Sequence, residues 1–267
     1  MTPSDYFTLT GEPAPLILTA VHDGHAVRPA LADRFALSAA ERLYEEDPHT
    51  ATWATLREPN VVGLRSRFEV DLNRPREKAV YREPADAWGL HVWRQPLSEA
   101  EIERSLAAYD AFYGSMQAFL ERVVEAYGSF VVYDIHSYNH RREADDRQPA
   151  DPAGNPVVNV GTRNMNRERW APVVDAFVDT MRGHTLAGEP LDVRENVKFP
   201  GGYLNHWIHE TFPDVSCVLS IEFKKVFMDE HTGEVDEPRL RELQAALSDT
   251  FDPVLDAREA VTGAHAE

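Results

Sequence analysis

Three histidines follow apolar runs of the sequence, and their positions suit a metal ion. His22 and His25 lie three residues apart, in a glycine-containing turn after the apolar run 16–21. His136 directly follows a second apolar run, 130–135. Neutral imidazole binds zinc well, and a catalytic zinc takes three protein ligands and a water molecule. We therefore expect His22, His25 and His136 to hold one Zn²⁺ per chain; the alternative for each is a hydrogen-bonded histidine that binds no metal.

Two carboxylates occupy strand-like segments near these histidines. Asp134 stands two residues before His136 and therefore on the same face of a strand, where it could orient a ligand. Glu222 lies within the apolar run 217–223, and a carboxylate there is costly unless it is paired or functional. Beside a zinc ion, Glu222 would be the base that takes a proton from water. The alternative for Glu222 is a buried structural pair with a lysine or arginine.

Basic side chains gather in the segment 65–74, which reads RSRFEVDLNR. Guanidinium groups bind carboxylates through paired hydrogen bonds, so this segment suits recognition of an acidic ligand. Arg163 adds a positive group in the loop-like segment 159–164, and Gly202 belongs to a glycine pair that permits close backbone approach to a ligand. The alternative for 65–74 is a surface strand with salt bridges.

Apolar strands and amphipathic helices alternate along the chain. The pattern predicts helices at 98–127, 167–181 and 238–251, strands at 16–21, 61–64, 68–72, 130–135 and 217–223, and a frayed polar tail after residue 257. This alternation is typical of a three-layer α/β/α fold with a central mixed, mostly parallel sheet. Ligands of such sheets bind beyond the carboxyl ends of the strands, where we expect His22, His136 and Glu222. We expect one catalytic domain over residues 1–267.

The bulk composition excludes several kinds of partner. The formal net charge of −18 disfavours nucleic acid and anionic membranes, so a pocket for an anionic substrate must be locally basic. Neither a secretory signal nor a long apolar run is present, and the single cysteine, Cys217, permits no intrachain disulfide. The sequence therefore predicts a cytoplasmic protein, and it leaves the oligomeric state open.

Taken together and in this order, several segments resemble the N-formylglutamate amidohydrolase family. The matching stretches are VHDGH, SRFEVDLNRPRE, VYDIHSYNHRR, NVGTRN, GGYLNHW and SIEFKKVFMDE. That family is similar in turn to the zinc carboxypeptidases and aspartoacylase. The resemblance implies a zinc-carboxypeptidase-like (phosphorylase/hydrolase-like) fold, with His22 and His136 as metal ligands and Glu222 as the base. It also implies that Asn73 and Arg74 bind the substrate carboxylate.

The resemblance departs from the relatives at two positions. They have glutamate where this chain has His25, so Asp47 and Glu46 are reserve candidates for the third ligand. Their substrate-facing tyrosine has no counterpart, and Tyr138 or Tyr203 could take its place.

The resemblance implies a zinc-dependent amidohydrolase that converts N-formyl-L-glutamate to formate and glutamate, a reaction of histidine degradation. Arg65 or Arg67 would stabilise the oxyanion, and Asn73, Arg74 and Arg163 would hold the two substrate carboxylates. Tyr138 and Gly202 would complete the substrate site. The alternatives are a metallo-carboxypeptidase, a deacylase for another N-acyl amino acid, a non-catalytic metal- or carboxylate-binding module, and a plain structural domain.

Overall fold

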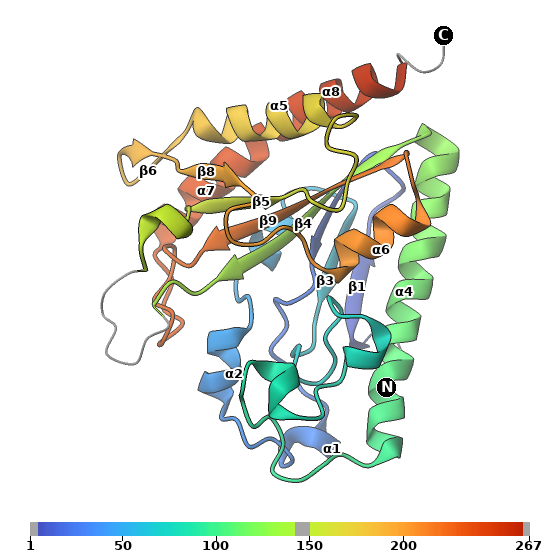
Figure 1. Cartoon of the computed structure of the whole chain (residues 1–267), viewed down its shortest axis with the longest axis vertical. Coiled ribbons are helices and arrows are strands. Elements are labelled where there is room, and N and C mark those ends of the chain that lie inside the picture. The colour runs from blue at the N-terminus through green and yellow to red at the C-terminus, as the bar shows by residue number, and fades with distance from the viewer. Residues whose placement is uncertain (1–4, 142–149, 264–267) are drawn as a thin grey trace.

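The computed structural model describes residues 5–141 and 150–263, and within them a seven-stranded sheet forms the centre of the molecule (Figure 1). The strands of this sheet are β1 (Phe7–Thr10), β2 (Leu16–Ala20), β3 (Asn60–Gly63), β4 (Phe130–Tyr138), β5 (Val158–Gly161), β8 (Val193–Glu195) and β9 (Ser216–Lys224). Their order is β1-β3-β2-β4-β9-β5-β8. A short hairpin pairs β6 (Thr185–Leu186) with β7 (Glu189–Pro190).

The pairing of the strands confirms the predicted mixed, mostly parallel sheet. Four neighbouring pairs run parallel, namely β2–β3, β2–β4, β4–β9 and β5–β8. Strand β1 is antiparallel to β3, and β5 is antiparallel to β9. The central strands are buried on both faces, which explains why they read as continuous apolar runs in the sequence.

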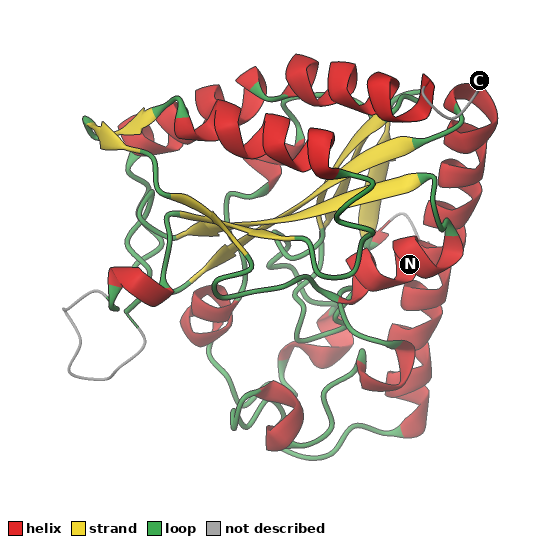
Figure 2. Cartoon of the chain, turned by 45° about the horizontal axis from the view of Figure 1, so that its top comes forward, coloured by secondary structure: helices red, strands yellow, loops and turns green. Residues whose placement is uncertain are grey.

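Helices cover both faces of the sheet (Figure 2). They are α1 (Pro29–Ala32), α2 (Ala39–Glu45), α3 (Ala51–Ala54), α4 (Glu99–Tyr127), α5 (Ala171–Arg182), α6 (Tyr203–Thr211), α7 (Glu237–Asp249) and α8 (Phe251–Gly263). One apolar core packs α3, α5, α7 and α8 against the sheet, and a second packs α4 and α6 against the opposite face. None of the described helices has both the length and the apolar character needed to span a bilayer.

The period of two along a strand decides which face carries the polar residues. Phe130 and Val132 of β4 and Val218 of β9 point into the core beneath α4 and α6. Because alternate residues share a face, His136 and Glu222 point to this same side, nearer the carboxyl ends of their strands. His136 and Glu222 also pair directly across the ladder between β4 and β9.

Local capping signals were reliable guides to helix α4. The Ser98 side chain accepts a hydrogen bond from the Glu101 backbone N–H, and the Glu101 side chain accepts one from the Ser98 N–H, as the predicted capping box requires. Gly128 ends the helix in the left-handed region at φ 73°.

Three local predictions were wrong. The segment 68–72 is not a strand but irregular chain that begins in a turn, where the Ser66 hydroxyl accepts a hydrogen bond from the Phe68 N–H. Helix α5 begins at Ala171 instead of 167. The predicted helix 238–251 and the polar tail are two helices, α7 and α8, because Pro253 fits only a first turn.

Candidate metal centre

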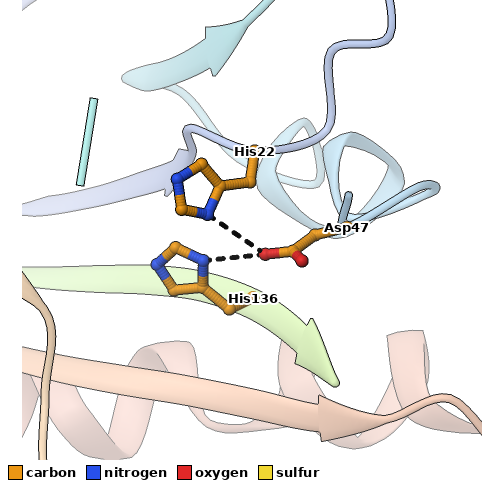
Figure 3. Close-up of side chains that lie close together, drawn as sticks. All are labelled: His22, Asp47 and His136. Atoms are coloured by element: carbon orange, nitrogen blue, oxygen red, sulfur yellow. Dashed lines mark hydrogen bonds and ion pairs between the residues drawn. The ribbon is translucent and has the colours of Figure 1, made fainter. Parts of the chain in front are cut away.

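Two histidines and an aspartate meet at the carboxyl edge of the sheet (Figure 3). His22 follows β2, His136 lies near the end of β4, and Asp47 follows α2. The Asp47 Oδ2 atom lies 2.9 Å from His136 Nδ1 and 3.5 Å from His22 Nδ1. All three side chains are buried, and their potential ligand atoms lie within 4.8 Å of one another.

The structure groups Asp47, and not His25, with His22 and His136. The imidazole Nδ1 of His25 instead contacts the Glu46 carboxylate. The other oxygen of Glu46 accepts a hydrogen bond from the Ser66 hydroxyl. Glu46, the second reserve candidate, is therefore committed to His25 and Ser66, and Asp47 is the carboxylate that faces the two histidines.

Each of the two histidines is oriented by a second carboxylate on its far side. His22 Nε2 lies 2.7 Å from Asp71 Oδ1, and His136 Nε2 lies 3.2 Å from Asp134 Oδ1. Such pairs fix the proton on Nε2 and leave Nδ1 with a lone pair, which is the form a metal ligand needs. The orienting role expected for Asp134 agrees with this distance, whereas Asp71 lies in the matching stretch SRFEVDLNRPRE but had no role assigned to it from the sequence.

Asp47 and His136 shift each other's pKa values. Burial by itself raises the pKa of Asp47, but the interactions with His136 and His22 outweigh it and hold that pKa well below its usual value. Burial lowers the pKa of His136, but Asp134 and Asp47 raise it well above the ordinary value. The buried carboxylates thus favour a cation at this position, either a protonated imidazole or a metal ion.

Buried contacts position the loop that carries Asp47. The ammonium group of Lys225 donates hydrogen bonds to the Tyr44 carbonyl at 2.9 Å and to the Glu46 carbonyl at 2.7 Å. The Asp47 N–H donates to the His22 carbonyl at 3.1 Å. Lys225 is 2% exposed, so this lysine ties the end of β9 to the candidate metal centre.

Glu222 stands beside this centre on β9. In the sheet, its register partners on the neighbouring strands are His136 of β4 and Asn159 of β5. Burial raises the pKa of Glu222 to about 8, with Asp47 and Asp134 adding to the shift and His136 opposing it. The Glu222 carboxyl can therefore gain and lose a proton near neutral pH.

The arginines expected to line one substrate pocket contact different parts of the protein. Arg67 donates to Asp71 Oδ2 at 2.8 Å, and Arg74 Nε lies 3.9 Å from the same atom. Arg65 instead donates to the Asp5 carbonyl at 3.0 Å, toward the N-terminal segment. Arg163 has an exposed side chain, and its backbone N–H donates to the Pro200 carbonyl. The structure thus brings Arg67 and Arg74, but not Arg65, to the residue that orients His22.

Asn73 connects His136 of the candidate metal centre to helix α6. Its Oδ1 accepts a hydrogen bond from the Leu204 N–H at 2.8 Å, and its Nδ2 lies 3.2 Å from His136 Nε2. A Cβ on Gly202 would lie 2.3 Å from Asn73 Nδ2, so a larger residue at this position would displace the Asn73 amide. Tyr138 is on the same strand face as His136, and its hydroxyl donates to the Pro156 carbonyl.

The donor set fits a divalent metal such as zinc. Two imidazole nitrogens and one carboxylate oxygen form a known type of catalytic zinc site. His22 Nδ1 is buried without a hydrogen-bond partner among the described residues, although nearly all buried polar atoms have one. A metal ion at this point would satisfy that atom.

Comparison with solved structures confirms the fold. An N-formylglutamate amidohydrolase from Ralstonia eutropha JMP134 matches with a TM-score of 0.71 and 20% sequence identity, covering 97% of this chain and 99% of that one. A gene product from Agrobacterium tumefaciens matches with a TM-score of 0.64 and 18% identity, covering 99% and 98%. The comparison with curated proteins gave no match. Fold and site together define an α/β protein with a candidate metal centre at the carboxyl edge of its sheet.

The sequence itself identifies the family. Residues 14–228 match the N-formylglutamate amidohydrolase family, which covers most of the chain. The chain belongs to the N-formylglutamate amidohydrolase family, and it is therefore an enzyme of the hydrolase class.

Proposed function

We propose that this enzyme hydrolyses N-formyl-L-glutamate to formate and glutamate with one zinc ion held by His22, Asp47 and His136. Membership of the amidohydrolase family supports the reaction. The observation that carries the metal assignment is that one potential ligand atom from each of the three buried side chains lies within 4.8 Å of the other two. His25, a ligand expected from the sequence, contacts Glu46 through its Nδ1, and we therefore assign the third ligand position to Asp47.

The chemistry divides between the metal and the chain. A bound zinc ion supplies Lewis acidity, which makes water a nucleophile near neutral pH. Glu222 accepts the proton of the attacking water and delivers it to the leaving nitrogen of the formamide. Burial raises the pKa of this carboxyl, and the positive charge of a bound metal ion would lower it again, so that Glu222 would be ionised and able to accept the proton near neutral pH. Its position directly opposite His136 in the ladder supports this role.

The substrate carboxylates require positive charge in an acidic protein. Arg67 and Arg74 share the single charge of Asp71, so the three groups together carry a surplus positive charge. We assign Arg74 and Asn73 to one substrate carboxylate and Arg67 to the developing oxyanion. The bonds of Arg65 to the N-terminal segment favour Arg67 for the oxyanion. Arg163, Tyr138 and Gly202 stay predicted members of the substrate site.

The experiment combines metal content with a substrate panel. Protein purified without chelators should contain about one zinc per chain, and it should release formate from N-formylglutamate faster than acetate from N-acetylglutamate or an amino acid from a C-terminal dipeptide. Preference for the acetyl or peptide substrate would replace the proposal with another deacylase or a carboxypeptidase. Histidine degradation, the cytoplasmic location and a single catalytic domain over residues 1–267 remain predictions.

The assignment of the base has a separate test. Glu222→Gln should keep the zinc and lose at least about 10²-fold in kcat, because the amide cannot accept a proton. Glu125→Gln, which changes an exposed residue of α4, is the matched control and should leave kcat unchanged. A Glu222→Gln enzyme with a near-wild-type rate would remove Glu222 from the mechanism.

A further inference from the structure

The most exposed large apolar side chain in the described part of the chain is Trp88. The residue is 52% exposed. It follows the short 3₁₀ helix η3 (Pro84–Ala87) and adopts φ 54°, a left-handed conformation that bulky residues rarely take. Gly89 continues the turn at φ 94°. An exposed indole in an unfavourable backbone conformation indicates a local function, because such outliers concentrate at binding and catalytic sites.

The indole ring of Trp88 lies against two guanidinium groups. The guanidinium carbon of Arg67 is 5.1 Å from the ring centroid, and that of Arg74 is 5.6 Å away. Both distances lie within the range of cation–π attraction. The ring also contacts Tyr81 edge to face, with centroids 6.1 Å apart. Trp88 and Tyr81 therefore form an aromatic wall beside the two arginines.

The two arginines differ in what else holds them. Arg67 donates a hydrogen bond of 2.8 Å to Asp71. For the Arg74 side chain, the nearest carboxylate oxygen among the described residues is that of Asp71, 3.9 Å from Nε, which is beyond hydrogen-bond reach. The Arg74 guanidinium also lies 5.5 Å from the Tyr81 ring centroid. The aromatic wall is thus the main contact that fixes the head of Arg74.

This arrangement leaves Arg74 able to bind an anion. Its side chain is 28% exposed, and Asp71, the acid nearest to it, is already bonded to His22 and Arg67. A cation–π contact with aromatic rings holds a guanidinium without using its N–H donors, which point outward in the plane of the guanidinium. Those donors then remain for a carboxylate of the ligand.

We propose that Trp88 is a positioning residue that holds Arg74 in the orientation needed to bind a substrate carboxylate. The inference rests on the proposed function, because it takes a carboxylate-bearing substrate from it. Trp88 does not contact the candidate metal ligands in this scheme. Arg67, the other guanidinium beside the ring, stays bonded to Asp71 when Trp88 is lost, so the loss should weaken substrate binding and leave the chemical step intact.

The test compares Trp88→Leu and Trp88→Phe with wild type, using the zinc-loaded full chain. An exposed cation–π contact is worth about two- to fivefold in binding. Trp88→Leu should raise the KM for N-formylglutamate about fivefold with kcat within about twofold, and Trp88→Phe should restore most of the affinity. Tyr127→Leu, at another exposed aromatic residue on α4, is the control and should change neither constant.

A double-mutant cycle separates positioning from general destabilisation. In an Arg74→Met background, Trp88→Leu should have no further effect on KM, since the group it positions is gone. A KM within 1.5-fold of wild type, a kcat that falls with it, or an equal effect in the Arg74→Met background would each overturn the proposal. If wild type fails to hydrolyse N-formylglutamate, the proposed function fails, and calorimetric binding of L-glutamate to the same variants then decides the role of Trp88. Binding to Trp88→Leu that is about fivefold weaker than to wild type supports this role. Equal affinity of the two proteins, or no binding to wild type, overturns it.

Discussion

Replacing Asp47 tests the assignment of the third metal ligand. The carboxylate lies 2.9 Å from His136 Nδ1 and 3.5 Å from His22 Nδ1, whereas His25 is turned toward Glu46. Asp47→Asn keeps the shape of the side chain but removes its charge, and it should therefore weaken zinc binding strongly. His25→Ala removes an imidazole that lies outside the group, so it should keep the metal.

The size of the loss follows from the number of ligands. Four-ligand zinc sites in small domains bind with about 10–16 kcal/mol, which is about 2.5–4 kcal/mol per ligand. Losing most of the binding free energy that one ligand contributes should raise the dissociation constant for zinc about 10²–10³-fold. His25→Ala should change that constant by less than about threefold, because Glu46 keeps its bond to Ser66.

The assay is competition with a chromophoric zinc chelator at fixed pH and ionic strength, with circular dichroism to establish that each variant is folded. The reasoning is refuted if His25→Ala loses as much zinc affinity as Asp47→Asn. It is equally refuted if Asp47→Asn binds zinc as tightly as wild type.

Three further predictions concern the surroundings of the site. Asp71→Asn should weaken zinc binding about 10–100-fold by releasing the orientation of His22, and unchanged affinity in the chelator assay would contradict it. Gly202→Ala should lower kcat/KM about tenfold or more, because its Cβ displaces Asn73; steady-state kinetics at normal zinc content check this, and an unchanged ratio counts against it. Burial lowers the pKa of His209 from its ordinary 6.5 to about 4, so between these values the unfolded chain binds a proton that the folded chain excludes. Stability should therefore fall as pH drops from 7 to 4.5, by about 1–2 kcal/mol from this half-buried group, and urea unfolding of His209→Gln should show a shallower dependence on pH; an equal dependence would exclude His209 as a source.

Local patterns in the sequence were sufficient for the framework of the molecule. Apolar runs located strands β2, β4 and β9, since a strand buried on both faces must be apolar. The capping box at Ser98 located the start of α4. The ends of the same runs placed His22, His136 and Glu222 at one edge of the sheet, because parallel strands share their carboxyl ends.

The tertiary structure alone decided which side chains meet at the site. Asp47 reaches the histidines because Lys225, distant in sequence, holds the carbonyl groups of its loop. Sequence spacing alone favours His25, but in the fold the Nδ1 atom of His25 contacts the Glu46 carboxylate. The direction of a loop side chain is set by long-range contacts, which no local periodicity encodes. Local periodicity determines where a strand or helix runs, and the packing of distant segments determines which of its polar neighbours share an ion.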